Sequence, residues 1–148
     1  MISKLDHQQK EIAEAIQRIQ KPAYEVEAKL IGFDGIPQIN ESAAEIRKSE
    51  EIFFGWTEQE LKGFISFKKT GQTIDIHRLV VAPPAFRQGI GSKLLAYLLE
   101  QYSGWEFVVN TGSANQPAIN LYKSFGFIEQ ERFEVAPGIM CSSFLKRK

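Results

Sequence analysis

Apolar residues at helical spacing dominate the first third of the chain. The segment Asp6-His7-Gln8-Gln9 predicts a helix start, because an N-cap acid is followed by Gln three residues later. The apolar positions that follow recur every three or four residues: Ile12, Ala15, Ile16 and Ile19. Pro22 predicts that this helix ends or restarts, so a second helix is expected over 23–31, stopping near Gly32. A loop over 33–40 and a short helical turn over 42–48 complete this region.

From Glu50 onward the hydrophobic period shortens toward two, which indicates strands. A three-strand meander is expected over 52–57, 61–70 and 74–81. The elements that follow are a helix over 91–102, a strand over 105–109, a helix over 116–124, and a hairpin over 127–135 and 139–145. No repeat, low-complexity tract or linker interrupts this order. We therefore expect one domain over residues 1–148, with an α/β or α+β layered fold.

The strand before residue 82 changes phase along its length. Ile74 and Ile76 share one parity, whereas Leu79 and Val81 carry the other. A regular strand keeps its phase, so this shift favours a β-bulge between residues 77 and 79, a feature common at functional rims. The alternative is that Val80 makes the end of a regular strand buried on both faces.

Composition narrows the class of partner. Lys plus Arg and Asp plus Glu both number 18, so the net charge is zero and the basic footprint of a nucleic-acid binder is missing. The chain has no run of about 18 apolar residues, so no membrane span is predicted. The first residues lack the apolar core of a signal peptide. We therefore expect a cytoplasmic protein. Cys141, the single cysteine, is expected to be a buried small hydrophobe, and no metal site is predicted.

A Gly-x-Gly sequence at the start of the predicted helix over 91–102 indicates a phosphate site. Gly89 and Gly91 allow close approach of the backbone to a ligand, and the free N–H groups of a helix start attract an anion. A dinucleotide fold would need a third Gly where Leu94 stands, and Gly91-Ser92-Lys93 does not fit a P-loop. Acyl-coenzyme A is the third reading.

Two motifs resemble those of the GNAT superfamily of acyl-CoA-dependent N-acyltransferases. The first is Val81-Ala82-Pro83 followed by Phe86-Arg87-Gln88-Gly89-Ile90-Gly91 and Leu94-Leu95. The second is Asn115-Gln116-Pro117-Ala118-Ile119-Asn120-Leu121-Tyr122-Lys123-Ser124-Phe125-Gly126-Phe127. The resemblance covers nearly the whole chain and is weakest before Glu50. It implies a mixed, mostly antiparallel, splayed sheet of about six to seven strands flanked by about four helices, with acyl-CoA in the V-shaped opening.

The resemblance also implies roles for particular residues. Tyr122 would be the general acid, since its ordinary pKa of about 10 lies near the value of about 8.5 for the departing thiol. Asn115, seven residues earlier on the same helix face, would cap the helix and contact the pantetheine arm. The backbone of Leu79, Val80 and Val81 would bind that arm as an added strand. The pyrophosphate would be held by the backbone of Arg87, Gln88, Gly89, Ile90, Gly91 and Ser92.

The chain departs from the family pattern at two places. Phe86 stands where the family usually has Gln or Arg, and Arg87 stands where a Gly is frequent. Asn110 stands where some relatives have a Glu that accepts a proton. No side-chain base is therefore assigned. Two residues that could serve as a base, Asp75 and His77, lie on the strand leading to the site. Four acids in the N-terminal region are candidates to attract a cationic amine: Glu25, Glu27, Asp34 and Glu41.

The leading functional hypothesis is an N-acetyltransferase. It would move an acetyl group from acetyl-CoA, its cosubstrate, directly to a primary amine of a small molecule or peptide through a tetrahedral intermediate. One alternative is a non-catalytic domain that binds acyl-CoA as a sensor, and another is a structural or nucleotide-binding domain that shares only the fold. The sequence does not identify the amine, and a homodimer is suggested only by the family.

Overall fold

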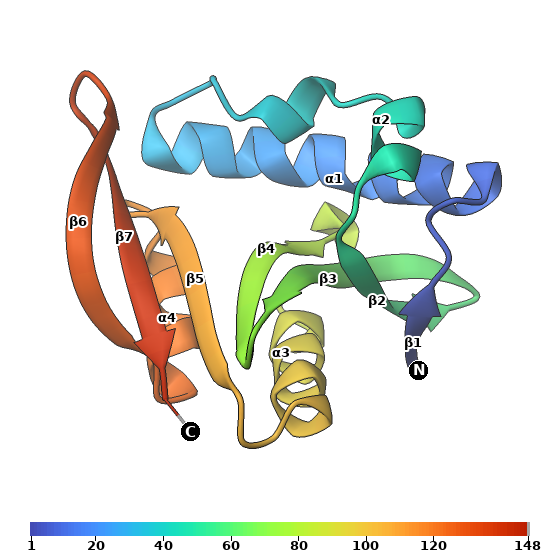
Figure 1. The fold of residues 1–148 in the computed structure, drawn as a ribbon. Helices are drawn as coiled ribbons and strands as arrows, with labels where there is room; N and C mark the ends of the chain where they lie inside the picture. Colours follow the sequence, from blue (N-terminus) through green and yellow to red (C-terminus); the bar gives the residue numbers. More distant parts are fainter. Residues whose placement is uncertain (148) are drawn as a thin grey trace.

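The computed structural model describes residues 1–147, which form one mixed sheet with helices on both faces (Figure 1). The strands lie in the order β1-β2-β3-β4-β5-β7-β6. Their bounds are β1 Ile2–Leu5, β2 Ile52–Glu58, β3 Glu60–Thr70, β4 Thr73–Val81, β5 Glu106–Gly112, β6 Ile128–Ala136 and β7 Ile139–Lys146. The helices are α1 Lys10–Ile31, α2 Ala43–Lys48, α3 Ile90–Gln101 and α4 Gln116–Ser124, with 3-10 turns at Pro37–Asn40 and Pro83–Ala85. The expected splayed α/β architecture is confirmed.

The sheet opens between β4 and β5, the one parallel pair in the described part of the chain. Their pairing runs from Thr73 opposite Glu106 to Ile76 opposite Val109 and then stops. Both strands continue, β4 to Val81 and β5 to Gly112, without pairing to each other. This divergence creates the V-shaped opening seen in Figure 1 between the lime and orange strands.

A β-bulge on β4 lies at the start of this divergence. Ser66 pairs with Arg78 while the next residue, Phe67, pairs with Ile76, so His77 is the extra residue. The phase shift read from the sequence is thereby confirmed. Because a bulge bends its strand and increases the local twist, it turns the end of β4 away from β5.

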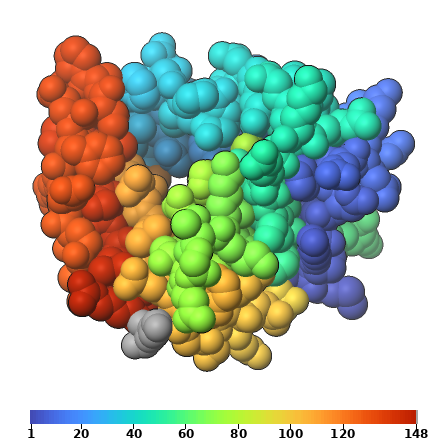
Figure 2. All heavy atoms as spheres, viewed as in Figure 1, coloured from blue at the N-terminus to red at the C-terminus, as the bar shows by residue number. Residues whose placement is uncertain are grey.

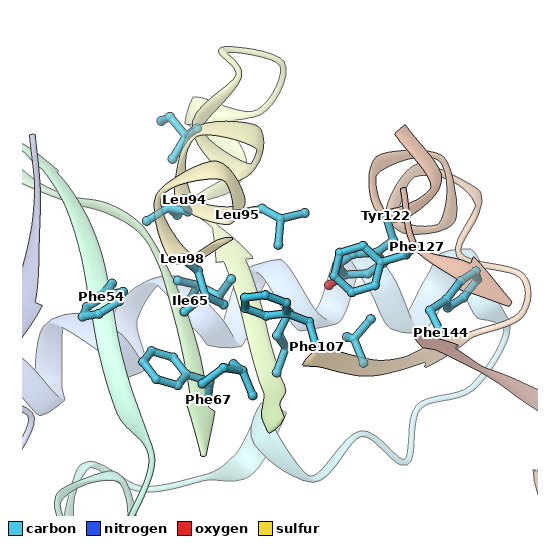
Figure 3. Packing of buried hydrophobic residues seen from close by; sticks show 14 of the residues in the cluster. Phe54, Ile65, Phe67, Leu94, Leu95, Leu98, Phe107, Tyr122, Phe127 and Phe144 are labelled. Atoms are coloured by element: carbon cyan, nitrogen blue, oxygen red, sulfur yellow. The ribbon is translucent and has the colours of Figure 1, made fainter. Parts of the chain in front are cut away.

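Strand alternation divides the core into two clusters. Phe54, Ile65 and Phe67 pack under α3 together with Leu94, Leu95 and Leu98 (Figure 3). On the opposite face Phe53 and Phe64 pack against Ile16 of α1 and Ile46 of α2. Neighbouring strand residues point to opposite faces, which explains why Phe53 and Phe54 serve different clusters. No helix in the described part of the chain has both the length and the apolar content that a membrane crossing requires.

Two expectations for the N-terminal region are wrong. Helix α1 runs unbroken through Pro22, because residues on both sides of the proline, including Ile19 and Tyr24, are buried against the sheet. That burial outweighs the backbone hydrogen bond that proline removes. The N-cap is Gln9, whereas the Asp6 carboxylate accepts from the backbone N–H of Gln8, at 3.2 Å, in the preceding turn.

Strand β1 was not expected, since it is a short edge strand stabilised mainly by pairing with β2.

Candidate active site

A cavity of about 570 Å³ occupies the opening between β4 and β5. Its walls come from α1, β4, the loop and first turn leading into α3, β5 and α4. Figure 2 shows the surface hollowed where the blue of α1, the lime of β4 and the orange of β5 meet. We call this cavity the cleft. Its two ends are named after the ligand groups that the sequence leads us to expect there: the phosphate end at the start of α3 and the acceptor end beside α1.

The end of β4 presents an unpaired edge to the cleft. Leu79, Val80 and Val81 pair with β3 on one side and line the cleft on the other, where β5 has moved away. Backbone groups on such an edge need hydrogen-bond partners. An extended ligand laid along β4 would supply them as an added strand does.

The loop before α3 has two residues with left-handed backbone geometry. Gly89 has φ 77° and Arg87 has φ 68°. A Cβ built on Gly89 meets no heavy atom within 4 Å, so crowding within the protein does not demand a glycine here. The positive φ favours glycine instead. Helix α3 begins directly afterwards at Ile90, with Gly89 as its N-cap. The free N–H groups of this first turn favour an anion at the cleft wall.

Most of the predicted phosphate-end residues lie together, with one exception. The cleft is lined by Arg87, Gly89, Ile90, Gly91 and Ser92. Gln88 instead lines a separate hollow with Leu61 and Pro84. The two left-handed residues on either side of Gln88 rotate the chain at that position, which a linear motif does not reveal.

Helix α4 brings Asn115 and Tyr122 to the cleft, as the spacing predicted. Asn115 is the N-cap, and its side-chain oxygen accepts from the Ala118 N–H at 3.3 Å. The Tyr122 ring packs against Phe127, with ring centroids 5.5 Å apart. Figure 3 shows its oxygen pointing from α4 toward the side on which Phe107 lies.

The Tyr122 side chain is almost enclosed, yet the residue contributes to the lining of the cleft. The residue is 4% exposed, and burial, reinforced by the charge of Glu27, raises the pKa of its hydroxyl well above the ordinary value. Tyr122 lines the cleft, and its hydroxyl remains protonated there at neutral pH.

Among the residues that helix α1 contributes to the cleft are Tyr24, which was not predicted, and Glu27, one of the four acids that the sequence offered as candidates. Burial raises the pKa of the Glu27 carboxyl above its ordinary value. Burial also raises the pKa of Tyr24, and the Glu27 charge adds to this increase. Of the four acids that could attract a cationic amine, Glu27 alone lines the cleft.

A buried ion network holds α1 and the segment after it against β4. The Arg78 guanidinium, 4% exposed, contacts Glu51 at 3.0 Å, the Gln20 side-chain oxygen at 3.0 Å, and Glu41. Although burial opposes ionisation of Glu51, hydrogen bonds from Arg78 and Ser66 hold its pKa below the ordinary value. Arg78 immediately follows the bulged residue, so the bulge directs it toward these partners. The sequence did not indicate this network.

The two base candidates on β4 lie close to each other. His77 Nε2 is 3.3 Å from Asp75 Oδ2, and the other ring nitrogen is 4.0 Å from Glu51. His77 and Asn110 line the cleft, whereas Asp75 does not. Cys141 is partly exposed and not buried as expected, because its strand, β7, lies near one end of the sheet.

Comparison with known proteins now decides the family. The profile of the Acetyltransferase (GNAT) family matches residues 13–127, which span the cleft residues of α1, β4, α3 and α4. This chain belongs to the GNAT family. The resemblance inferred from the two motifs is thereby confirmed.

Individual proteins also resemble this chain over most of its length. The "UPF0157 protein YqkA" of Bacillus subtilis (strain 168) is 40% identical over 146 residues, covering 97% of this chain. The chain spans 43% of that relative's length. Among solved structures, the ribosomal-protein-S18-alanine N-acetyltransferase of Escherichia coli has a TM-score of 0.76 at 19% identity, covering 98% of this chain and 91% of that one.

A third comparison is with a structure solved in complex with coenzyme A. The PaiA N-acetyltransferase of Thermoplasma acidophilum, solved in complex with coenzyme A, has a TM-score of 0.74 at 17% identity, covering 97% of this chain and 96% of that one. At these identities the structural likeness concerns the fold alone. The unpaired edge of β4 and the open Gly89 turn are independent features of this chain, and they suit an extended arm that ends in a pyrophosphate.

Proposed function

We propose that this GNAT protein transfers an acetyl group from acetyl-CoA to a primary amine of a small molecule or peptide, with Tyr122 as general acid. One observation carries the proposal. A single cleft holds the unpaired edge of β4, the N-terminus of α3 and a protonated Tyr122 hydroxyl. The first two suit the two parts of the cofactor, and the third suits the leaving sulfur.

The cofactor would be bound mainly by backbone groups. Leu79, Val80 and Val81 would hydrogen-bond the pantetheine arm along the free edge of β4. The loop and first turn of α3, from Arg87 to Ser92 with Gly89 at the turn, would hold the pyrophosphate. The Arg87 side chain would add a charge-assisted contact to a phosphate, and Asn115 would contact the arm from the opposite wall.

Tyr122 would donate its proton as the carbon–sulfur bond breaks. Its raised pKa guarantees the protonated form but makes it a weaker acid. The same desolvation acts on the thiolate leaving group, because burial disfavours any charged form. Both pKa values therefore rise together, and the small gap of about 1.5 between free tyrosine and a free thiol need not widen. One N–H of the β4 edge would stabilise the oxyanion.

The test is release of free coenzyme A from acetyl-CoA in the presence of a panel of amines. For Tyr122→Phe we expect the turnover number to fall by about 100-fold or more, with the Kd of acetyl-CoA changed less than about twofold. Tyr97→Phe is the matched control, since Tyr97 packs against Phe54 in the core and does not line the cleft. Tight acetyl-CoA binding without turnover on any amine would reject the proposal in favour of a non-catalytic acyl-CoA sensor.

A further inference from the structure

The acceptor end of the cleft has a composition distinct from the rest. One face of α1 supplies Ala23, Tyr24, Val26, Glu27 and Leu30 to the lining. None of these positions belongs to the two motifs that indicated the family. They are therefore the residues most free to determine which amine this protein accepts.

The charge at this end is negative. Glu27 forms no ion pair within residues 1–147. The nearby guanidinium of Arg78 is already paired with two carboxylates, those of Glu41 and Glu51. An unpaired carboxylate in a partly desolvated wall attracts a cation, and the cation it could bind must come from a ligand.

Glu27 on α1 and Tyr122 on α4 line the same cleft. Its charge adds to burial in raising the pKa of Tyr122 on α4, and it acts in the same way on Cys141 of β7. Glu27 therefore lies within electrostatic reach of the hydroxyl that would protonate the leaving sulfur. An amine held by Glu27 would be near the thioester carbonyl.

The rim beside Glu27 is apolar. Val26 is 46% exposed and Leu30 is 48% exposed, and both line the cleft. They lie four residues apart, so they form one apolar strip along the helix. Such a strip suits a ligand with a hydrophobic portion, whereas a polyamine or a sugar would leave it in contact with polar groups.

We propose that the acceptor is a primary monoamine with an apolar stem and no carboxylate near its nitrogen, and that Glu27 binds its ammonium group and accepts its proton. This inference rests on the proposed function. In the reaction, one N–H bond of the ammonium breaks and its proton passes to a Glu27 oxygen. The nitrogen lone pair then forms the C–N bond to the acetyl carbon, and the C–S bond breaks.

The remaining protons balance. The departing sulfur takes the Tyr122 proton to give the thiol, and Tyr122 is reprotonated by the second proton that the nitrogen loses as the amide forms. Glu27 releases the first proton to solvent. The net products are an N-acetyl amine, free coenzyme A and one proton, so no further reactant is needed.

Two amines that differ only by a carboxylate give the first test. We expect kcat/KM for 2-phenylethylamine to exceed that for phenylalanine by about 10-fold or more, because a carboxylate beside the nitrogen would face Glu27. Glu27→Gln should lower kcat/KM for 2-phenylethylamine by about 100-fold. Glu25→Gln, an exposed change of the same kind on the same helix, should leave it unchanged. Glu27→Asp should restore part of the loss.

The pH profile separates a base from a merely structural residue. The native protein should show an acid limb as Glu27 ionises, and Glu27→Gln should lose that limb. The titratable or charged groups that line the cleft with Glu27 are Tyr24 of α1, His77 and Arg78 of β4, Arg87 before α3 and Tyr122 of α4. The charge of Glu27 also acts on Cys141 of β7. An unchanged rate and profile in Glu27→Gln would overturn this inference and leave the proposed function intact.

A binding measurement decides the case in which no amine is turned over. The protein saturated with coenzyme A is titrated with 2-phenylethylamine while the side-chain carboxyl of Glu27 is followed by NMR. A shift of that signal, with amine binding lost in Glu27→Gln, would support the acceptor site even though the proposed function had failed. No shift at millimolar amine would overturn the site as well.

Discussion

The two ends of the cleft are built in different ways. The phosphate end comes from a continuous segment, 79–92, and offers mostly backbone groups: a strand edge and the start of a helix. The acceptor end is made of side chains from α1, β4 and α4, which are up to 100 residues apart in the sequence. Backbone recognition suits a cosubstrate common to a whole family. Side-chain recognition suits an acceptor that differs between members.

The acceptor end also depends on an anchor that the phosphate end does not need. Helix α1 is held over the cleft by Arg78 and its partners Gln20 and Glu41, in addition to apolar packing. The phosphate end needs no comparable ion network, since its geometry follows from φ values at Arg87 and Gly89 and from the start of α3. Substitutions should therefore affect the two ends separately.

The largest expected effect comes from breaking the anchor. Arg78→Met leaves Glu51 buried without its partner, so we expect a loss of about 3–5 kcal/mol in the free energy of unfolding. Arg132→Met is the control, because Arg132 forms an ion pair with Glu129 at 2.7 Å on the surface, and it should cost at most about 1 kcal/mol. Urea denaturation measures both. Equal losses would mean that the Arg78 network does not anchor α1.

A second prediction isolates the phosphate end. Gly89 and Gly71 both have positive φ, and a Cβ at either meets nothing within 4 Å. Replacing either by Leu should therefore cost a similar amount of stability, about 1–2 kcal/mol. Only Gly89→Leu should weaken acetyl-CoA binding, by about 10- to 100-fold, the value of one charge-assisted hydrogen bond. Calorimetric titration gives the Kd, and an equal loss for both variants would contradict the assignment of the loop.

The smallest predicted effect concerns stability and pH at the acceptor end. Burial raises the folded-state pKa of Glu27 above its unfolded value of about 4.3. The corresponding stability is present when the group is protonated and is lost as pH rises through the folded pKa. Glu27→Gln should therefore raise Tm slightly at pH 7, and this gain should disappear below about pH 4. A thermal scan in which the variant is less stable at pH 7 would refute this sign.

The difference between the two ends also explains what the sequence could predict. Local motifs made three features predictable: the Gly89 turn at the start of α3, and Asn115 and Tyr122 on α4. The bulge at His77 was visible because strand parity is local too. Which of the four candidate acids would line the cleft was not predictable, since the position of Glu27 depends on α1 continuing past Pro22 and crossing the open sheet. Arg78 was missed for a similar reason, as its partners Glu41 and Glu51 come from other segments.

The central claim is that acetyl-CoA lies along the free edge of β4 with its pyrophosphate at the start of α3. Backbone amide shifts of the labelled protein, recorded by NMR during titration with acetyl-CoA, test it most directly. The account predicts that the largest changes fall on residues 79–81 and 87–92 and on Asn115, with little change at Gly71. Saturable binding that left those amides unperturbed, or that shifted mainly the β6–β7 hairpin, would contradict it.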